Sequence, residues 1–254
     1  MSLESFAAEV RARLAALEAQ AQQPRETSWP VTTGANPFIA PVSLTGGATT
    51  VSIPDARPTT PVVTLNAASV QPILLFPDAV RADGSHPAIL DQHLFAIREW
   101  LAEQYQRTFD LALPRALFSD LPASSHERLS QTPSPVVGEL VRLGVALPCE
   151  VPTVVWIVGV TPIDRAGFAW VPNWATPSLN LAAVTNPTDG LVLHELAHLW
   201  LVSGQHDRTP VGGGFDPYVN VMHPEACVGT PLSRLRFTEA DAQRLRTSLH
   251  LAAI

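Results

Sequence analysis

The sequence predicts an α/β fold, and two patterns carry this prediction. Short apolar runs typical of buried strands occur at residues 73–76 and 151–160. Between them, residues 87–106 and 135–143 place apolar side chains three or four positions apart, which is the spacing of helices that pack on a sheet. Strand, helix, helix and strand in this order is typical of α/β proteins.

The elements follow one another from residue 71 to residue 254, which we expect to form one domain. Pro87 suits the first turn of the first helix, and Gly144 ends the second. Residues 167–172 and 178–182 have the composition of further short strands separated by turn residues. Trp170 and Trp174 in this part of the chain are expected to be core residues rather than cleft residues.

The first 70 residues differ in composition from the rest. Residues 1–23 alternate Glu and Arg with Leu and Ala, which predicts an amphipathic helix and not a signal peptide. Residues 24–70 are rich in Pro, Thr and Gly and predict an extension or linker. This extension suits a surface arm or a propeptide, and the sequence does not decide between them.

Composition excludes several classes of function. Apolar residues make up 46% of the 254 residues, and no apolar run is long enough to cross a bilayer, so we expect a soluble protein with no membrane partner. A net charge of -7 argues against nucleic acid as a partner. All 16 basic residues are arginine, which excludes Schiff-base and P-loop lysine chemistry. The compartment and the oligomeric state stay open.

The segment that carries chemistry is His194-Glu195-Leu196-Ala197-His198, inside an apolar run of helical length with Thr188 or Asp189 as N-cap. Histidines four apart project from the same face of a helix, so both imidazoles can bind one Zn²⁺. Glu195 is the expected general base, because a carboxylate beside the ion can take a proton from bound water. The pattern predicts hydrolysis of an amide bond in a peptide or protein substrate.

Two downstream segments extend this pattern. Gly204-Gln205-His206-Asp207 offers a third ligand, and Tyr218-Val219-Asn220-Val221-Met222-His223-Pro224 follows it. Together they resemble the metzincin zinc endopeptidases, whose signature is His-Glu-x-x-His-x-x-Gly-x-x-His followed by a Met-turn. The resemblance implies a twisted mixed sheet, an active-site helix and a C-terminal helix, which here would begin at Thr238. It also implies one catalytic Zn²⁺ held by His194, His198 and His206, and Met222 beneath the ion.

The resemblance further implies the substrate side of the site. His223 and Pro224 would help to form the specificity pocket, and an edge strand at residues 167–171 or 178–182 would pair with extended substrate. Tyr218 is a weaker candidate to stabilise the oxyanion.

The sequence departs from the family pattern after the second histidine. Leu201 stands where the family has Gly, so we expect the helix to continue to Gly204 before the chain turns back. His206 then follows His198 by eight residues. The reserve ligands are His223, Asp207 and Asp216.

Alternatives remain open at this point. A gluzincin-type aminopeptidase would need Glu225 or Glu239 as the third ligand, and a non-catalytic zinc-binding module would keep the fold without cleaving. Cys149 and Cys227 are either a disulfide, which we expect if the protein is exported, or two buried thiols.

Overall fold

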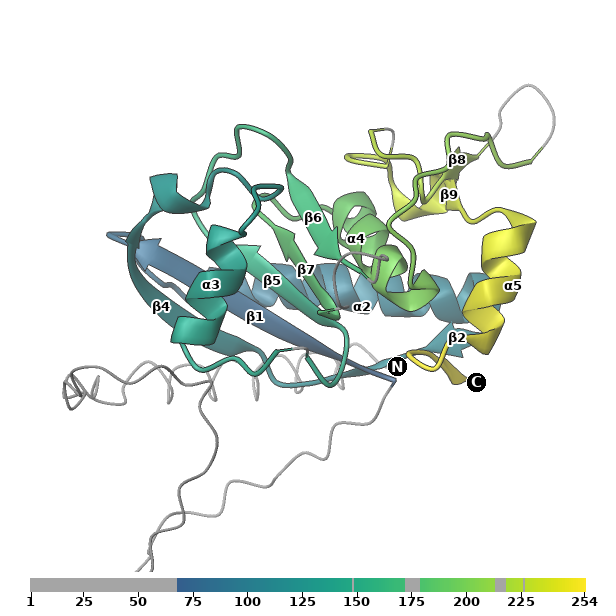
Figure 1. Ribbon diagram of the computed structural model, residues 1–254. Helices are drawn as coiled ribbons and strands as arrows, with labels where there is room; N and C mark the ends of the chain where they lie inside the picture. The colour runs from purple at the N-terminus through teal and green to yellow at the C-terminus, as the bar shows by residue number, and fades with distance from the viewer. Residues whose placement is uncertain (1–67, 148, 172–178, 213–217, 226) are drawn as a thin grey trace, which may run out of the picture.

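The computed structural model describes residues 68–254 except 148, 172–178, 213–217 and 226 (Figure 1). The predicted helix at residues 1–23, most of the extension at 24–70, Trp174 and Asp216 lie outside the described residues. The helices are α2 (Ser85–Tyr105), α3 (Pro135–Arg142), α4 (Asp189–Leu201) and α5 (Glu239–Thr247), with short 3-10 turns η1 (Ala123–His126) and η2 (Leu232–Arg234).

The main sheet is mixed. Its strands are β1 (Ser69–Asp78), β3 (Asp110–Leu111), β4 (Arg115–Pro122), β5 (Thr153–Ile157), β6 (Gly167–Trp170) and β7 (Leu181–Val184). Across the sheet the order is β3-β1-β5-β7-β6, and β4 extends the sheet beside β1 on the same side as β3. All neighbours are parallel except β6, which runs antiparallel to β7 and forms the edge.

Two small two-stranded sheets complete the fold. One pairs β2 (Arg107–Thr108) with β10 (Ala252–Ala253), and the other pairs β8 (Val219–Asn220) with β9 (Leu235–Arg236). Strand β8 is the next element after α4 along the chain, and the segment that contains Met222 follows it directly.

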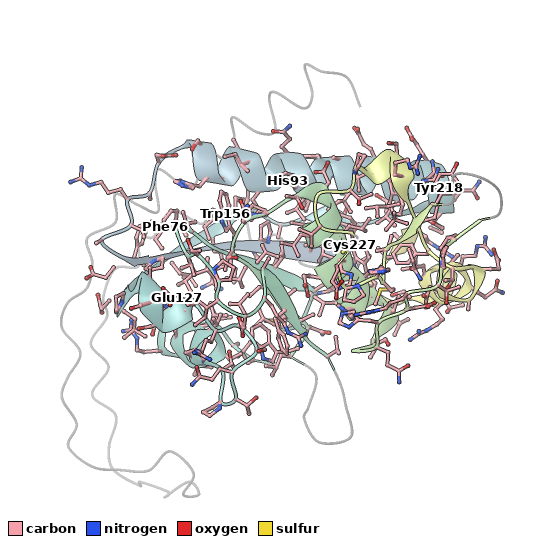
Figure 2. The ribbon with its side chains drawn as sticks, turned by 90° about the horizontal axis from the view of Figure 1, so that it is seen from above. Phe76, His93, Glu127, Trp156, Tyr218 and Cys227 are labelled. Atoms are coloured by element: carbon pink, nitrogen blue, oxygen red, sulfur yellow. The ribbon has the colours of Figure 1, made fainter. Side chains whose placement is uncertain are left out.

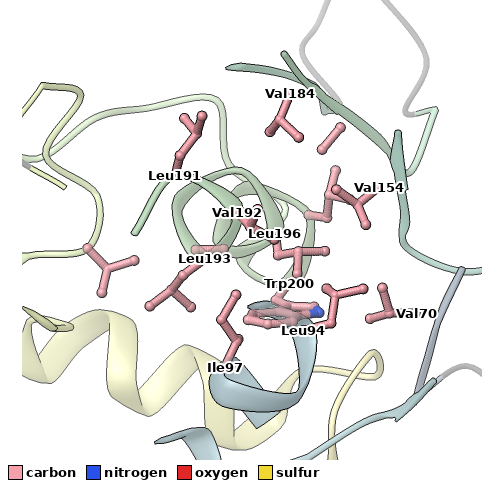
Figure 3. Close-up of a cluster of buried hydrophobic side chains, with 14 of the residues drawn as sticks. Val70, Leu94, Ile97, Val154, Val184, Leu191, Val192, Leu193, Leu196 and Trp200 are labelled. Atoms are coloured by element: carbon pink, nitrogen blue, oxygen red, sulfur yellow. The ribbon is translucent and has the colours of Figure 1, made fainter. Parts of the chain in front are cut away.

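Alternation along the strands gives the sheet two buried faces. One face packs against α2 and α4 (Figure 3), and its strand residues are Val70, Leu74, Phe76, Val154, Trp156, Ala182 and Val184. The other face packs against α3, with Ile73, Leu75, Val155, Ile157, Leu181 and Ala183. A strand that is apolar on both sides is what a sheet covered by helices on both faces requires.

The α/β prediction is confirmed, with differences at the element ends. The helices predicted at 87–106 and 135–143 correspond to α2 and α3, and the N-cap predicted at Thr238 accepts a hydrogen bond from Asp241 N. The strand at 73–76 is longer than predicted and starts at Ser69, inside the predicted extension. Strand β4 was missed, because Pro114 and Pro122 at its ends made this part of the chain look irregular.

Among the described helices, none has the length and apolar character to cross a membrane.

Candidate metal centre

Helix α4 carries the His-Glu-x-x-His motif into the interior. The Thr188 side chain caps its N-terminus by accepting a hydrogen bond from Leu191 N at 3.2 Å. Asp189 in the first turn pairs with His93 of α2 at 2.6 Å, and Figure 2 labels His93 on that helix. A Cβ at Gly190 would collide with the carbonyl oxygen of Cys227, so only glycine lets α4 approach that segment so closely.

The structure brings His194, His198 and His206 together. Nε2 of His198 lies 3.2 Å from Nε2 of His194 and 3.3 Å from Nε2 of His206. Ligand atoms of all three fall within 4.8 Å of one another, and the rings of His194 and His206 stack at 5.2 Å. His194 and His198 are buried, whereas His206 is exposed. The eight-residue spacing therefore still allows His206 to reach the two helical histidines.

The two buried histidines are oriented by backbone carbonyls. Nδ1 of His194 lies 2.7 Å from the carbonyl oxygen of Val221, and Nδ1 of His198 lies 2.5 Å from that of Ser203. An Nδ1–H that donates to a carbonyl leaves Nε2 as the lone-pair nitrogen, which is the form that binds a metal. Burial, reinforced by the neighbouring histidines, lowers the pKa of His194 to about 3, and burial lowers the pKa of His198 to about 4. Both imidazoles are thus neutral at pH 7.

The segment around Met222 positions two of the three histidines. Its Val221 carbonyl accepts from His194, and the Met222 carbonyl accepts from Asp207 N at 3.1 Å, next to His206. Asn220, which is buried, holds the turn because its Oδ1 accepts from Met222 N at 3.0 Å and its Nδ2 donates to the carbonyl of Thr209. The Met222 side chain is itself buried in the core that surrounds α4.

The predicted continuation of α4 to Gly204 is wrong. The helix ends at Leu201, and Val202 takes the left-handed conformation with φ 50°. Side chains of the C-terminal region explain the stop, because Arg244 donates to the Leu201 carbonyl and Ser248 donates to the Trp200 carbonyl at 2.8 Å. These donors satisfy carbonyls at the helix end that a longer helix would have used.

Glu195 lines a cavity together with the three histidines, and it is 4% exposed. Burial raises the pKa of its carboxyl group to about 8, an effect that the positive charge of Arg165 partly opposes. A Cβ at Gly167, the first residue of β6, would lie 2.5 Å from Oε1 of Glu195, so the carboxylate packs directly on the backbone of the edge strand. Of the two segments predicted as this edge, β6 is the one that occupies it.

The remaining predicted residues are divided between the cavity and its surroundings. Pro224 lines the cavity. Trp170 also lines it, and its half-buried side chain packs against the core on the α3 face of the sheet, so its predicted core role is confirmed in part. Tyr218, which is labelled in Figure 2, does not line the cavity. The Cζ atom of Arg236 lies 4.2 Å from the centroid of its ring. His223 accepts from Glu225 N through Nδ1 and is not a member of the histidine cluster.

The acidic candidates for a third ligand also lie outside the cluster. Asp207 accepts from Thr209 N at 2.9 Å. The side chain of Glu225 is 75% exposed and pairs with Arg208, and that of Glu239 is 83% exposed and pairs with Arg246.

A cavity of about 730 Å³ opens in front of the cluster. Its apolar wall residues include Phe168, Trp170, Val171 and Leu191, and its polar ones include Ser130, Gln131, Thr132, Asp164, Arg165 and Arg208. A concave site of this size that combines apolar walls with convergent polar groups is typical of ligand sites.

Sequence reasoning missed several residues of this site. Asp164, Arg165 and Asn220 carry no recognisable motif, although the proximity of Asp164 and Arg165 to the predicted edge strand was a usable signal. The disulfide alternative is wrong, since Cys149 and Cys227 are free, buried thiols that belong to opposite faces of the sheet.

No protein-family model matches the chain, and no curated protein matches it. Among solved structures, the chain is similar to a protein described as "Structure of a chaperone-substrate complex", with a TM-score of 0.39 and 14% sequence identity over 74% of this chain and 35% of that one. The chain thus spans about a third of that protein's length. At this TM-score the likeness indicates neither a common family nor a common function.

Proposed function

We propose that this chain is a metzincin-type zinc endopeptidase in which Glu195 acts as general base. The observation that carries the proposal is the convergence of three Nε2 atoms, 3.2 Å and 3.3 Å apart, next to a buried carboxylate in the wall of a large cavity. The mixed sheet supports the same proposal, because its antiparallel edge strand β6 borders that cavity, where the metzincin resemblance places a strand that pairs with substrate.

The donor set fits Zn²⁺. Neutral imidazole nitrogens are preferred ligands of zinc, and three protein ligands leave a position for water in a catalytic site. The carbonyls of Val221 and Ser203 fix two of the rings in the tautomer that coordination needs. When both Nδ1 atoms carry the proton, the Nε2 lone pairs face one another and form no hydrogen bond, whereas a shared cation binds all three.

When bound, the ion lowers the pKa of a water molecule and polarises the substrate carbonyl. The protein's own contribution is proton transfer. A cation held by the three histidines would oppose the effect of burial and favour the ionised form of Glu195. The Glu195 carboxylate then accepts a proton from the attacking water and delivers it to the departing amine nitrogen. The carboxylate packs against the backbone of Gly167, where any larger side chain would collide with it.

Metal analysis of the full chain tests the ligand set. We expect about one zinc per chain in the purified protein, and loss of that zinc in His194→Ala, His198→Ala and His206→Ala. His223→Ala and Asp207→Ala are the matched controls, since neither residue belongs to the cluster, and both should stay loaded. A His206→Ala protein that keeps its zinc while Glu225→Ala loses it would favour the gluzincin alternative and overturn this ligand set.

Cleavage of a quenched casein or peptide library, with and without a chelator, tests the activity. Zinc-dependent cleavage is the expected result. A stoichiometrically loaded protein that cleaves no peptide of the library would refute the peptidase proposal in favour of a non-catalytic zinc-binding module.

A further inference from the structure

Arg165 lines the cavity and lies two residues before the edge strand β6. The Cζ atom of its guanidinium is 5.7 Å from the ring centroid of Phe168, another residue of the cavity wall. The same cavity contains His194, Glu195 and His198.

The backbone that carries Arg165 is firmly anchored by its neighbour. The carboxylate of Asp164 accepts four hydrogen bonds, from Arg165 N at 2.7 Å, Leu129 N at 3.1 Å, Ser130 N at 2.9 Å and Ser130 Oγ at 2.7 Å. These bonds connect two loops that form the polar wall. They also use the Asp164 carboxylate for backbone contacts, so its charge is engaged in holding the wall together.

The two arginines of the cavity differ in their partners. Arg208 forms an ion pair with Glu225 at 3.1 Å, so its charge is balanced at the rim. No ion pair within the described part of the chain involves Arg165, and its side chain contacts the Phe168 ring instead. Arg165 is thus a cation at the cavity with no protein carboxylate bound to it.

Arg165 shares the cavity wall with His206 and Glu195. The wall also carries the charged side chains of Arg208, Asp164 and Glu225. Glu225 pairs with Arg208, and Asp164 is bound by backbone N–H groups and the Ser130 hydroxyl, which leaves Arg165 as the cation with which an incoming ligand can pair.

We propose that Arg165 is a specificity-determining residue that binds a carboxylate of the substrate close to the scissile bond, so that the preferred substrates are acidic peptides. A guanidinium presents paired N–H donors that match the two oxygens of a carboxylate. The carboxylate comes either from an Asp or Glu side chain, as in internal cleavage, or from a free peptide C-terminus, in which case the enzyme removes C-terminal residues instead of cutting internally. This inference rests on the proposed peptidase function and adds the substrate class.

Peptide binding tests the inference without requiring turnover. Fluorescence anisotropy is measured on zinc-loaded Glu195→Gln protein with three peptides of equal length: one with a Glu near its centre and an amidated end, its Gln counterpart, and that counterpart with a free C-terminus. We expect the Glu peptide, the free-end peptide or both to bind about 10-fold more tightly than the amidated Gln peptide, as for a charge-assisted hydrogen bond at a partly exposed site. Which of the two gains identifies the source of the carboxylate.

Arg165→Gln in the same background should abolish the preference, and high salt should weaken it. Arg98→Gln is the matched control, because the Arg98 guanidinium also lies over a phenylalanine ring, Phe95 at 4.4 Å, but does not line the cavity. Equal affinity for all three peptides, or a preference that survives Arg165→Gln, would overturn the role of Arg165. A protein that holds no zinc would instead count against the peptidase proposal itself, so the two failures are distinguishable.

Discussion

Two buried glutamates, one on each side of the sheet, are treated in opposite ways. Glu139 in α3 is 3% exposed, and it receives two hydrogen bonds from Arg142 at 2.7 Å and one from Ser119. These contacts lower the pKa of Glu139 despite the opposing effect of burial. Glu195 in α4 is 4% exposed, yet no hydrogen bond in the described part of the chain satisfies its carboxylate, and burial raises its pKa to about 8.

The difference separates a carboxylate that stabilises the fold from one that is kept free for chemistry. A buried charge normally costs stability unless it is paired and hydrogen-bonded, and Glu139 meets that requirement within its own helix and from β4. Glu195 does not meet it, and it faces a cavity beside three imidazoles. Unpaired groups with raised pKa values are enriched at active sites, which is consistent with the proposed base.

The largest expected effect is on catalysis. Glu195→Gln should lower the rate of peptide cleavage by about 10²- to 10⁴-fold, the usual contribution of a general base. Zinc content and melting temperature should stay close to those of the wild type, because the amide fills the same volume. Quenched-peptide kinetics and metal analysis on the same sample measure both. A loaded Glu195→Gln protein with wild-type activity would contradict the assignment of the base.

Substitution of Glu139 should lower stability and leave catalysis unchanged. Glu139→Ala removes the acceptor of Ser119 and Arg142, which leaves a buried hydroxyl without its partner, and should cost about 1–3 kcal/mol in the free energy of unfolding. For a chain of this size each kcal/mol corresponds to a fall of about 2–4 °C in melting temperature. Urea denaturation and calorimetry measure the loss. Cleavage per folded molecule should not change, and a loss of activity without a loss of stability would erase the contrast between the two glutamates.

Several buried groups should make the fold less stable in acid, and two of them, His126 and Glu139, lie outside the metal centre and can be tested separately. His126 is fully buried near Glu139, neither of its ring nitrogens has a hydrogen-bond partner, and burial lowers its pKa below 6.5. Below pH 6.5 His126 is therefore protonated more readily in the unfolded chain than in the folded chain. The free energy of unfolding decreases as the pH is lowered through this range. Because the Glu139 pKa lies below 4.5, its stabilising contribution is complete above pH 4.5 and is lost as the pH falls through the lowered value.

Unfolding free energies measured from pH 7 to pH 3 distinguish the two groups. His126→Leu should make the fall directly below pH 6.5 less steep, and His194 and His198 account for the part that remains. Glu139→Gln should leave that part unchanged and reduce the fall below pH 4.5. Parallel curves for wild type and His126→Leu would show that His126 does not contribute to the fall below pH 6.5.

The smallest expected effect concerns the end of α4. A β-branched residue in the left-handed region costs about 1–2 kcal/mol, and asparagine tolerates that conformation much better. Val202 is 50% exposed, so Val202→Asn loses little apolar burial and should gain up to about 1 kcal/mol of stability. Val141→Asn is the control, because Val141 is 55% exposed but lies within α3. A gain at position 141, or a loss at 202, would contradict the strain at Val202.

These contrasts also mark what the sequence could predict. Periodicity located α2, α3 and the core strands, and the spacing of His194 and His198 placed both on one helical face. The sequence alone could not show where α4 ends, since the donor Arg244 lies in α5 and the donor Ser248 directly after it, more than forty residues downstream. The i,i+3 spacing of Glu139 and Arg142 was a usable signal for the pairing of Glu139, but the contact with Ser119 and the cavity in front of Glu195 arise only from the tertiary fold.

The two buried thiols divide the molecule into separately observable halves. Cys227 is 0% exposed and belongs to the face with α4, whereas Cys149 is 8% exposed and belongs to the face with α3. With no other cysteine in the sequence, each thiol can react with a solution reagent only when its own layer opens. The rates at which the two are labelled therefore give the opening kinetics of the two layers in one unmodified protein, with Cys227 reporting on the layer that carries the histidines.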